Sequence, residues 1–236
     1  MANTLDIPYV DFSRVHSRLD RLMDPYKRNS AIAVFGAQGS GKSHLIRHGI
    51  LNVRPMARTV VFDVKAGHSK VWDGYGKQVD ELRPGFHGDG GAPFGNAYHF
   101  MVHPDRETGK RQLAKALNQI STEGHCVVVI DESRKVTERE QYGQSSAVEN
   151  LITTGRESGI TVILGAQSSA WAVSSLQDQP GARFIGRVPG REKELSAMAG
   201  YGSELIPTLR AIKHRSFLYT DALDENQEPI LGITGL

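Results

Sequence analysis

The glycine-rich segment GAQGSGKS, residues 36–43, constrains the fold more than any other part of the sequence. The apolar stretch AIAVF at 31–35 precedes it and predicts a short buried strand, and residues 42–52 predict a helix after it. Glycines let backbone amides turn inward around a phosphate, and the amino terminus of the following helix adds partial positive charge. Strand, loop and helix together predict a phosphate-binding loop of the pattern G-x-x-x-x-G-K-[ST].

Individual residues of this loop have separate predicted roles. Lys42 is predicted to reach the β- and γ-phosphates of a nucleotide, and Ser43 to hold Mg²⁺. The other positions predicted to contact the nucleotide are Gly36, Gln38, Gly39, Ser40, Gly41 and His44. The sequence has no NKxD motif, which argues against a GTPase, and no LSGGQ-like stretch, which argues against a transporter ATPase. The predicted cofactors are therefore ATP and Mg²⁺.

Further apolar stretches predict a parallel sheet. Buried strands are expected at 59–63, 126–131 and 160–167, and 97–102 is a further candidate strand. Helices are expected at 12–23, 108–122 with Thr108 as its cap, 146–157 and 191–199. Strands that are apolar throughout and alternate with helices indicate a mostly parallel sheet with helices on both faces. The tail predicts added edge strands, which can be antiparallel, at 182–188, 212–221 and 229–235.

These elements predict an α/β protein with a RecA-like P-loop NTPase core. We expect one ATPase domain over 30–236, preceded by an N-terminal helical extension over 1–29, because 236 residues leave little room for a second core. Residues 66–96 are rich in glycine and are expected to form a loop. Cys126 lies in an apolar run and is expected to be a buried, reduced thiol.

Charge and hydropathy limit the class of protein further. The formal net charge of +2 is nearly neutral, so any contact with DNA would need local positive charge. No stretch approaches the ~20 apolar residues of a membrane span. The N-terminus has no basic region followed by an apolar one, so no signal peptide is expected. These features predict a cytoplasmic protein or a soluble part of a larger assembly.

Two adjacent carboxylates, Asp131 and Glu132, lie at the end of the buried strand expected at 126–131, in the segment CVVVIDES. Neighbouring strand residues point to opposite faces, but the chain turns at the strand end, so both Asp131 and Glu132 can reach one site. Asp131 is predicted to support Mg²⁺ together with Ser43, and Glu132 to polarise the attacking water. A solvated strand end is the alternative for this pair. The phosphate-binding loop earlier in the chain favours the catalytic interpretation.

Gln167 ends the apolar run ITVILGAQ, which is expected to lie beside the strand of Asp131. A buried amide needs hydrogen-bond partners, and this one can donate to a phosphate oxygen and accept from water. Gln167 is therefore predicted to sense the γ-phosphate. A strand-end amide that bonds a neighbouring loop is the alternative.

Three arginines are candidates for a transition-state contact. Arg156, in TTGRESG, is predicted to be an arginine finger that completes the site of a neighbouring subunit, which requires a ring or filament. Arg183 and Arg187, in ARFIGRV, are alternative or additional candidates. A cation at a helix end is the structural alternative for Arg156.

The order GAQGSGKS, VVFDVK, VVVIDES, TTGRESGITVILGAQSS and ARFIGRV resembles the HerA/FtsK superfamily of hexameric DNA-pumping ATPases over roughly residues 30–220. The matching positions are Asp63, Lys65, Arg156, Gly159, Ile160, Ala166, Gln167 and Arg183. The sequence departs from members with membrane spans, a winged-helix tail or an extra barrel. The resemblance thus implies a bare motor core, like the small genome-packaging ATPases of membrane-containing icosahedral viruses.

This resemblance implies double-stranded DNA as a partner, a homo-oligomer in the form of a hexameric ring, a capsid vertex or portal protein as docking partner, and a host-cytoplasmic or virion-associated location. Two basic segments that leave the sheet where ligands bind in open α/β folds could then contact DNA phosphates. Their candidate residues are Lys65, Lys70, Arg134, Lys135 and Arg139. Trp72 and Tyr75 are expected either to contact sugars or to pack, and solvated charged loops are the alternative for both segments.

The leading hypothesis from the sequence is an ATP-driven duplex-DNA translocase that packages a viral genome. A plasmid- or phage-borne FtsK-like DNA transfer ATPase is the nearest alternative. A small-molecule kinase would use the same phosphate loop, but it would need an arginine-rich lid, and residues 66–96 are poor in arginine. A non-motor ATP-dependent assembly protein is the third alternative.

Overall fold

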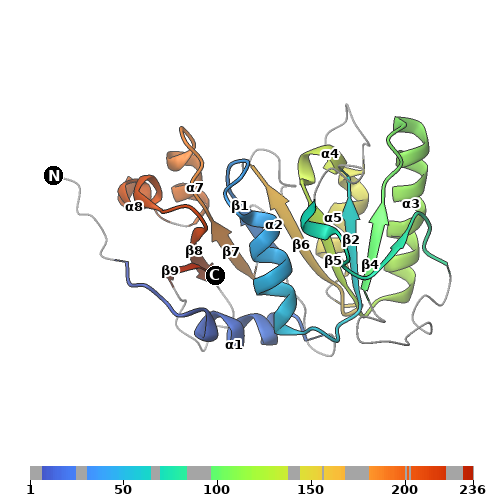
Figure 1. Ribbon diagram of the computed structural model, residues 1–236, viewed down its shortest axis with the longest axis horizontal. Helices are drawn as coiled ribbons and strands as arrows, with labels where there is room; N and C mark the ends of the chain where they lie inside the picture. The colour runs from blue at the N-terminus through green and yellow to red at the C-terminus, as the bar shows by residue number, and fades with distance from the viewer. Residues whose placement is uncertain are drawn as a thin grey trace.

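One sheet organises the part of the chain that the structure describes. The computed structural model describes residues 7–24, 31–64, 70–83, 97–137, 144–155, 157–167, 181–199, 201, 203–221 and 231–235. Its strands there are β1 Ile32–Phe35, β2 Thr59–Asp63, β3 Lys77–Val79, β4 Ala97–Met101, β5 Val127–Asp131, β6 Thr161–Ala166, β7 Ala182–Ile185, β8 Ser216–Asp221 and β9 Leu231–Gly235. Their order across the sheet is β3-β4-β2-β5-β6-β1-β7-β8-β9 (Figure 1).

The directions of the strands confirm the predicted fold class. Every neighbouring pair from β3 to β7 is parallel, whereas β8 runs antiparallel to both β7 and β9. The molecule is therefore an α/β protein with a mostly parallel sheet, to which the C-terminal tail adds edge strands. The expectation that these added strands can be antiparallel is also confirmed.

Helices cover both faces of this sheet. They are α1 Phe12–Leu22, α2 Lys42–His44, α3 Arg106–Glu123, α4 Ser133–Thr137, α5 Ser145–Thr153, α7 Glu192–Met198 and α8 Ile206–Ala211. Ala33 and Phe35 of β1 pack in one apolar cluster with α3 and α5, while Ile32 and Val34 pack in a second cluster with α1 and the turns after α2. Figure 1 shows α2 in front of the sheet and α5 behind it. The two-sided burial explains why the central strands are mostly apolar.

The N-terminal segment lies against the last strand. Asp11 caps α1, since its Oδ1 accepts a hydrogen bond of 2.8 Å from the Ser13 amide. Val10 and Ile233 are joined by a backbone hydrogen bond of 2.8 Å. A Cβ on Gly232 would come within 2.0 Å of a Val10 methyl group, so only glycine lets the segment pass this closely. None of the described helices has the length and apolar character that crossing a membrane would require.

The capping residue of α3 differs from the prediction. Asp105, rather than Thr108, is the N-cap, and its Oδ2 accepts a hydrogen bond of 2.9 Å from the Thr108 amide. Both residue types can cap a helix, but Asp105 has the extended backbone (φ −67°, ψ 129°) that the position needs. Thr108 is therefore the third residue of the helix, and its predicted role as cap is wrong.

The helix after the phosphate-binding loop is less regular than predicted. It begins as α2, widens into a π-helical turn at Leu45–Ile50 and ends as a 3₁₀ turn at Leu51–Val53. Gly49, a weak helix former, lies inside the wide turn. Wide turns of this kind often occur at functional sites.

Two elements of secondary structure lie within residues 66–96, which the sequence predicted to be a loop. A 3₁₀ turn spans Lys70–Trp72, and β3 forms one edge of the sheet. Of the three residues of β3, only Val79 is apolar, so no strand pattern was visible. The short helices α4 and α8 were missed for the same reason, because five or six residues give too little periodicity.

Burial makes Cys126 chemically inert. The side chain is 3% exposed, and burial raises the pKa of its thiol to about 12. The thiolate is the reactive form, so at pH 8 only a very small fraction can react. We expect a maleimide or dithionitrobenzoate reagent to leave the native protein unlabelled at pH 8 and to label one thiol in urea. Labelling of the native protein at the rate of the unfolded chain would contradict this burial.

Candidate active site

Three neighbouring parallel strands bring the predicted catalytic residues to one edge of the sheet. In the order β5-β6-β1, strand β6 lies between the strand of the carboxylates and the strand of the phosphate-binding loop. Phe35 pairs with Ala166, and Asp131 pairs with Gly165. Parallel strands end at the same edge, so the loop at 36–43, the Asp131–Glu132 pair and Gln167 meet there.

The phosphate-binding loop has the backbone that its glycines predict. Gly39 and Gly41 have φ of 78° and 97°, in the left-handed region that glycine adopts without strain. Lys42 is 7% exposed, and its Nζ donates to the carbonyls of Gly36 at 2.7 Å and Ala37 at 3.1 Å. The loop thus holds an ammonium group at its centre.

A carboxylate oxygen at the end of β5 is bonded from both the phosphate-binding loop and the 3₁₀ turn at Lys70–Trp72. Ser43 Oγ donates to Asp131 Oδ2 at 2.6 Å, and the indole Nε1 of Trp72 donates to the same oxygen at 3.0 Å. A hydroxyl and a carboxylate in contact are the hard oxygen ligands that Mg²⁺ prefers, so this pair fits a magnesium site. Trp72 was expected either to contact sugars or to pack; it packs, fully buried, and its bond to Asp131 was not foreseen.

Glu132 has an unusual backbone that turns its side chain toward the same edge. Its φ is 86°, a conformation that costs a non-glycine residue about 1–3 kcal/mol. The side chain is 8% exposed, and Gln167 Nε2 lies 3.0 and 3.2 Å from its two carboxylate oxygens. The strand-end turn predicted from the sequence therefore exists, and Gln167 finds its partner in Glu132.

A missing side chain makes room for Asp131. Gly165 lies beside Asp131 on β6, and a Cβ there would come within 3.1 Å of Asp131 Oδ1. That contact is tighter than side chains usually make, so the carboxylate would have to shift.

A cavity of about 290 Å³ lies over the loop. Its lining residues are Gln38, Gly39, Gly41, Lys42, Ser43, His44, Val71, Glu132, His214 and Arg215. A second cavity of about 390 Å³ shares four of these residues and adds Ala37, Ser40, Arg187, Pro189, Lys213 and Ser216. Residues of the loop line both cavities, and we call the two together the nucleotide groove.

The turn before β8, which holds Lys213, His214 and Arg215, closes part of this groove. A ring nitrogen of His214 lies 2.7 Å from the Gly39 carbonyl, so that nitrogen carries the donated proton. Arg215 has a φ of 64° and packs where a Cβ on Gly41 would come within 3.3 Å of its Cγ. Sequence reasoning missed this turn, because its approach to the loop depends on the antiparallel pairing of β7 and β8. The only signal was its three consecutive basic residues.

Asp63, which the family resemblance singled out, lies at the same edge in register with Asp131. Its side chain is 2% exposed, and His99 Nε2 lies 3.2 Å from its Oδ2. The buried imidazole thus offers a hydrogen-bond partner to a carboxylate that lies on the strand beside Asp131.

Other predicted residues are placed less completely. Lys70 is exposed in the 3₁₀ turn, and Lys135 on α4 is partly buried with its Nζ 3.5 Å from the Val64 carbonyl. Arg134 lies in α4, but its side chain is outside the described part. The predictions for Lys65, Arg139 and Arg156 also lie outside the described residues.

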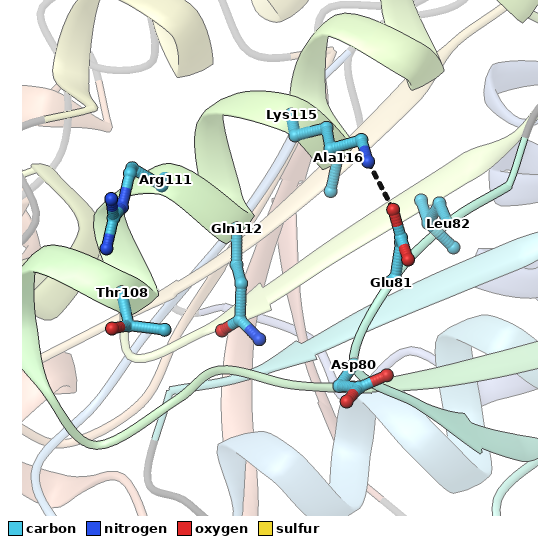
Figure 2. A pocket seen from close by; sticks show the side chains of 8 residues that line it. All are labelled: Asp80, Glu81, Leu82, Thr108, Arg111, Gln112, Lys115 and Ala116. Carbon is cyan, nitrogen blue, oxygen red and sulfur yellow. Dashed lines mark hydrogen bonds and ion pairs between the residues drawn. The ribbon is translucent and has the colours of Figure 1, made fainter.

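A third hollow, of about 360 Å³, lies beside α3 at the β3 end of the sheet. Figure 2 shows Lys115 of α3 directed at Glu81, with Asp80 below this pair and Arg111 farther along α3, to the left. Four strands separate β3 from β1, so the hollow is remote from the phosphate-binding loop. Its two cations and two carboxylates balance each other, and nothing about it resembles a catalytic arrangement.

Comparisons with known proteins bear on the fold. No family model matches the sequence, and no curated protein matches it. The solved genome packaging NTPase B204 from Sulfolobus turreted icosahedral virus 2, in complex with AMPPCP, is 16% identical with a TM-score of 0.62, covering 89% of this chain and all of that one. VirB4 of Thermoanaerobacter pseudethanolicus is 11% identical with a TM-score of 0.66, covering 90% and 92%. The chain thus has the fold of these two proteins, which confirms the predicted α/β fold with its mostly parallel sheet.

Proposed function

We propose that the protein is an ATPase that moves double-stranded DNA, and that its task is to package a viral genome. The observation that supports ATPase activity is that five side chains lie together at one edge of the sheet: Lys42, Ser43, Asp131, Glu132 and Gln167. Similarity in fold to a genome packaging NTPase supports the packaging role. A plasmid- or phage-borne FtsK-like DNA transfer ATPase is the nearest alternative.

The geometry suggests a role for each residue. Lys42 and the loop amides would hold the phosphates of ATP, and Ser43 and Asp131 would hold Mg²⁺, which when bound neutralises charge on the phosphate oxygens. Glu132 would take a proton from the water that attacks the γ-phosphorus, while the bond to the β-phosphate oxygen breaks. Gln167 bonds Glu132, and a γ-phosphate oxygen offers its amide a competing acceptor. Gln167 would thus bond either Glu132 or the γ-phosphate, and the contacts of the turn at Glu132 would differ between bound ATP and bound ADP.

The second cavity would take the nucleoside. Glu132 is not among its lining residues, and Pro189 offers an apolar surface while Lys213 and Arg215 offer donors. Ligand sites commonly combine apolar walls with a few polar groups in this way. Arg187 lines this cavity in its own chain, so we assign it a contact in cis.

Arg156 is proposed to act on a neighbouring subunit. Its flanking residues, Gly155 and Glu157, come before β6, whereas the nucleotide groove lies beyond the other end of that strand. A contact with ATP would therefore come from another copy of the chain. We propose a homo-oligomer in the form of a hexameric ring, which could dock on a capsid vertex or portal protein in the host cytoplasm.

The DNA contacts proposed for this ring lie at the carboxyl edge of the sheet. Lys70 and Lys135 follow β2 and β5, the strands that carry Asp63 and Asp131. Lys65, Arg134 and Arg139 belong to the same two segments of the sequence. Contacts of lysine and arginine with phosphates do not depend on base sequence and weaken with salt.

Duplex DNA is expected to stimulate ATP hydrolysis by the native protein, and the stimulation should fall as salt rises. The Lys70→Ala variant should lower the slope of log affinity for DNA against log salt by about 1. Lys193→Ala, which removes an exposed charge on α7, is the matched control and should leave that slope unchanged. Phosphate release and DNA binding measured across a salt series check both expectations.

The outcome also separates the alternatives. Absence of stimulation, together with a monomeric mass in the presence of ATP, would rule out a ring motor. Transfer of phosphate to a nucleoside instead of water would indicate a kinase. ATP-dependent oligomers that do not bind DNA even at low salt would indicate an assembly protein.

A further inference from the structure

Trp72 lies where a loop segment meets the magnesium ligands. Its side chain is fully buried, and its Nε1 donates to Asp131 Oδ2 at 3.0 Å, across 59 positions of sequence. The same oxygen accepts the hydroxyl of Ser43 at 2.6 Å. One carboxylate oxygen therefore receives two hydrogen bonds, one from the phosphate-binding loop and one from the 70–72 turn.

A second attachment fixes the segment that carries Trp72. Arg47, on the turn after α2, donates to the carbonyls of Val71 and Asp73, and its guanidinium lies 5.7 Å from the ring centre of Tyr75. Tyr75 in turn meets Trp72 edge to face, with ring centres 5.5 Å apart. Residues 70–75 are thus held both by the helix of the phosphate-binding loop and by Asp131, and Val71 lines the nucleotide cavity.

The two donors on Asp131 differ in what else they can do. The Ser43 oxygen keeps lone pairs for a cation while its hydrogen bonds Asp131. The indole N–H of Trp72 is a donor only and cannot bind a cation. Its contribution is to orient the carboxylate, in a dry environment where a hydrogen bond to a charged group is strong.

We propose that Trp72 is a positioning residue, whose N–H fixes the Asp131 carboxylate for Mg²⁺ and thereby ties the metal site to the 70–75 segment. The inference rests on the proposed binding of ATP with Mg²⁺. Because Lys70, a candidate for DNA contact, begins that segment, the tie would connect nucleotide state to the surface proposed to meet DNA.

The Trp72→Phe variant keeps the ring and removes the N–H. Groups that orient metal ligands typically change metal affinity by 10- to 100-fold, so we expect this variant to need about 10- to 100-fold more Mg²⁺ for half-maximal binding of a fluorescent ADP. Its affinity for the same ADP in EDTA should match that of the native protein. Tyr75→Phe is the matched control, because it removes a polar group from the same aromatic cluster without touching Asp131, and it should show the native dependence on Mg²⁺.

A double-mutant cycle tests the route of the effect. In an Asp131→Asn background, where the charged acceptor is gone, Trp72→Phe should add little further change to the Mg²⁺ requirement. Additive effects of the two substitutions would mean that Trp72 acts elsewhere.

The fluorescence of Trp72 provides a second test, which leaves Trp72 itself unchanged. The chain has two tryptophans, so Trp171→Phe leaves Trp72 as the only indole. We expect ADP with Mg²⁺ to shift or quench its emission, and ADP in EDTA to leave the emission unchanged. This reading decides the matter if Trp72→Phe does not fold.

The outcomes distinguish this inference from the proposed function. If native protein binds ADP with no dependence on Mg²⁺, both fail. If native binding depends on Mg²⁺ but Trp72→Phe shows the same dependence, or if the Trp72 emission ignores the metal, only the positioning role fails.

Discussion

Replacing Glu132 by Gln is expected to lower kcat for ATP hydrolysis by about 10²- to 10⁴-fold, the usual contribution of a general base, while ATP still binds. The amide has the shape of the carboxylate and can still meet Gln167, which lies 3.0 and 3.2 Å from the two carboxylate oxygens. It cannot take a proton from water. Phosphate release under saturating ATP measures kcat, and equilibrium binding of a fluorescent ATP measures affinity.

The control for this result is a carboxylate of the same type outside the site. Glu81 pairs with Lys115 at the remote β3 end of the sheet, so Glu81→Gln should leave kcat unchanged. A Glu132→Gln protein that retains more than about a tenth of native kcat would contradict the role of general base, because such a base contributes at least about 10²-fold.

The backbone of Glu132 allows its chemistry to be separated from its strain. Glycine adopts a φ of 86° without the cost that glutamate meets. Replacing Glu132 by glycine also removes a buried carboxylate beside Asp131. We expect Glu132→Gly to be inactive yet more stable by about 1 kcal/mol, which for a chain of this size raises Tm by about 2–4 °C. Stability gained together with activity lost would show that the strained turn is kept for catalysis.

The parts of the fold that the sequence predicted are those in which local pattern and final environment agree. The central strands are mostly apolar because both faces of the sheet are buried. Glycines and polar residues at either end of each apolar run mark the length of the strand in the sequence. The phosphate-binding loop could be located because strand, loop and helix are contiguous. Gln167 could be assigned to the strand beside Asp131 because parallel strands that end in polar residues meet at one edge.

The parts that escaped prediction depend on contacts between distant residues. Trp72 reads as one aromatic residue in a glycine-rich loop, and only the folded chain brings it to Asp131. His214 and Arg215 reach the phosphate-binding loop because β8 runs antiparallel to β7. The residues of the turn itself do not predict that direction. The edge strand β3 is held by its pairing with β4, since its own residues are mostly polar and exposed.

The residues that position the proposed chemistry also break local rules. Glu132 has positive φ, Arg215 has positive φ, and the helix after the loop contains a π-helical turn. Each would lower stability in isolation. Glu132 and Arg215 line the cavity over the loop, and the π-helical turn follows α2 directly. Departures of this kind are expected at functional sites, where the surrounding fold supports a conformation that the local sequence does not favour.

Mixing inactive Lys42→Ala protein with inactive Arg156→Ala protein is expected to restore ATP hydrolysis. Each variant alone should be impaired strongly, since an arginine finger contributes about 10³- to 10⁵-fold. In a head-to-tail ring assembled at random from equal amounts, about one interface in four joins an intact loop to an intact arginine, so about a quarter of native activity should return. Phosphate release at fixed total protein, over a series of mixing ratios, measures the recovery.

Two further mixtures make the test specific to a shared site. Lys42 and Glu132 line one cavity of one chain, so mixing Lys42→Ala with Glu132→Gln can never complete a site and should restore nothing. Arg187 lines the cavity of its own chain, so Arg187→Ala should likewise fail to complement Lys42→Ala. If co-assembled mixtures of the Lys42 and Arg156 variants stay inactive, the arginine does not cross between subunits. If a mixture of Lys42→Ala and Arg187→Ala recovers activity instead, Arg187 is the residue that acts on the neighbouring subunit. A Lys42→Ala subunit cannot hydrolyse ATP at its own loop, so it can restore activity only by supplying an arginine to its neighbour's site.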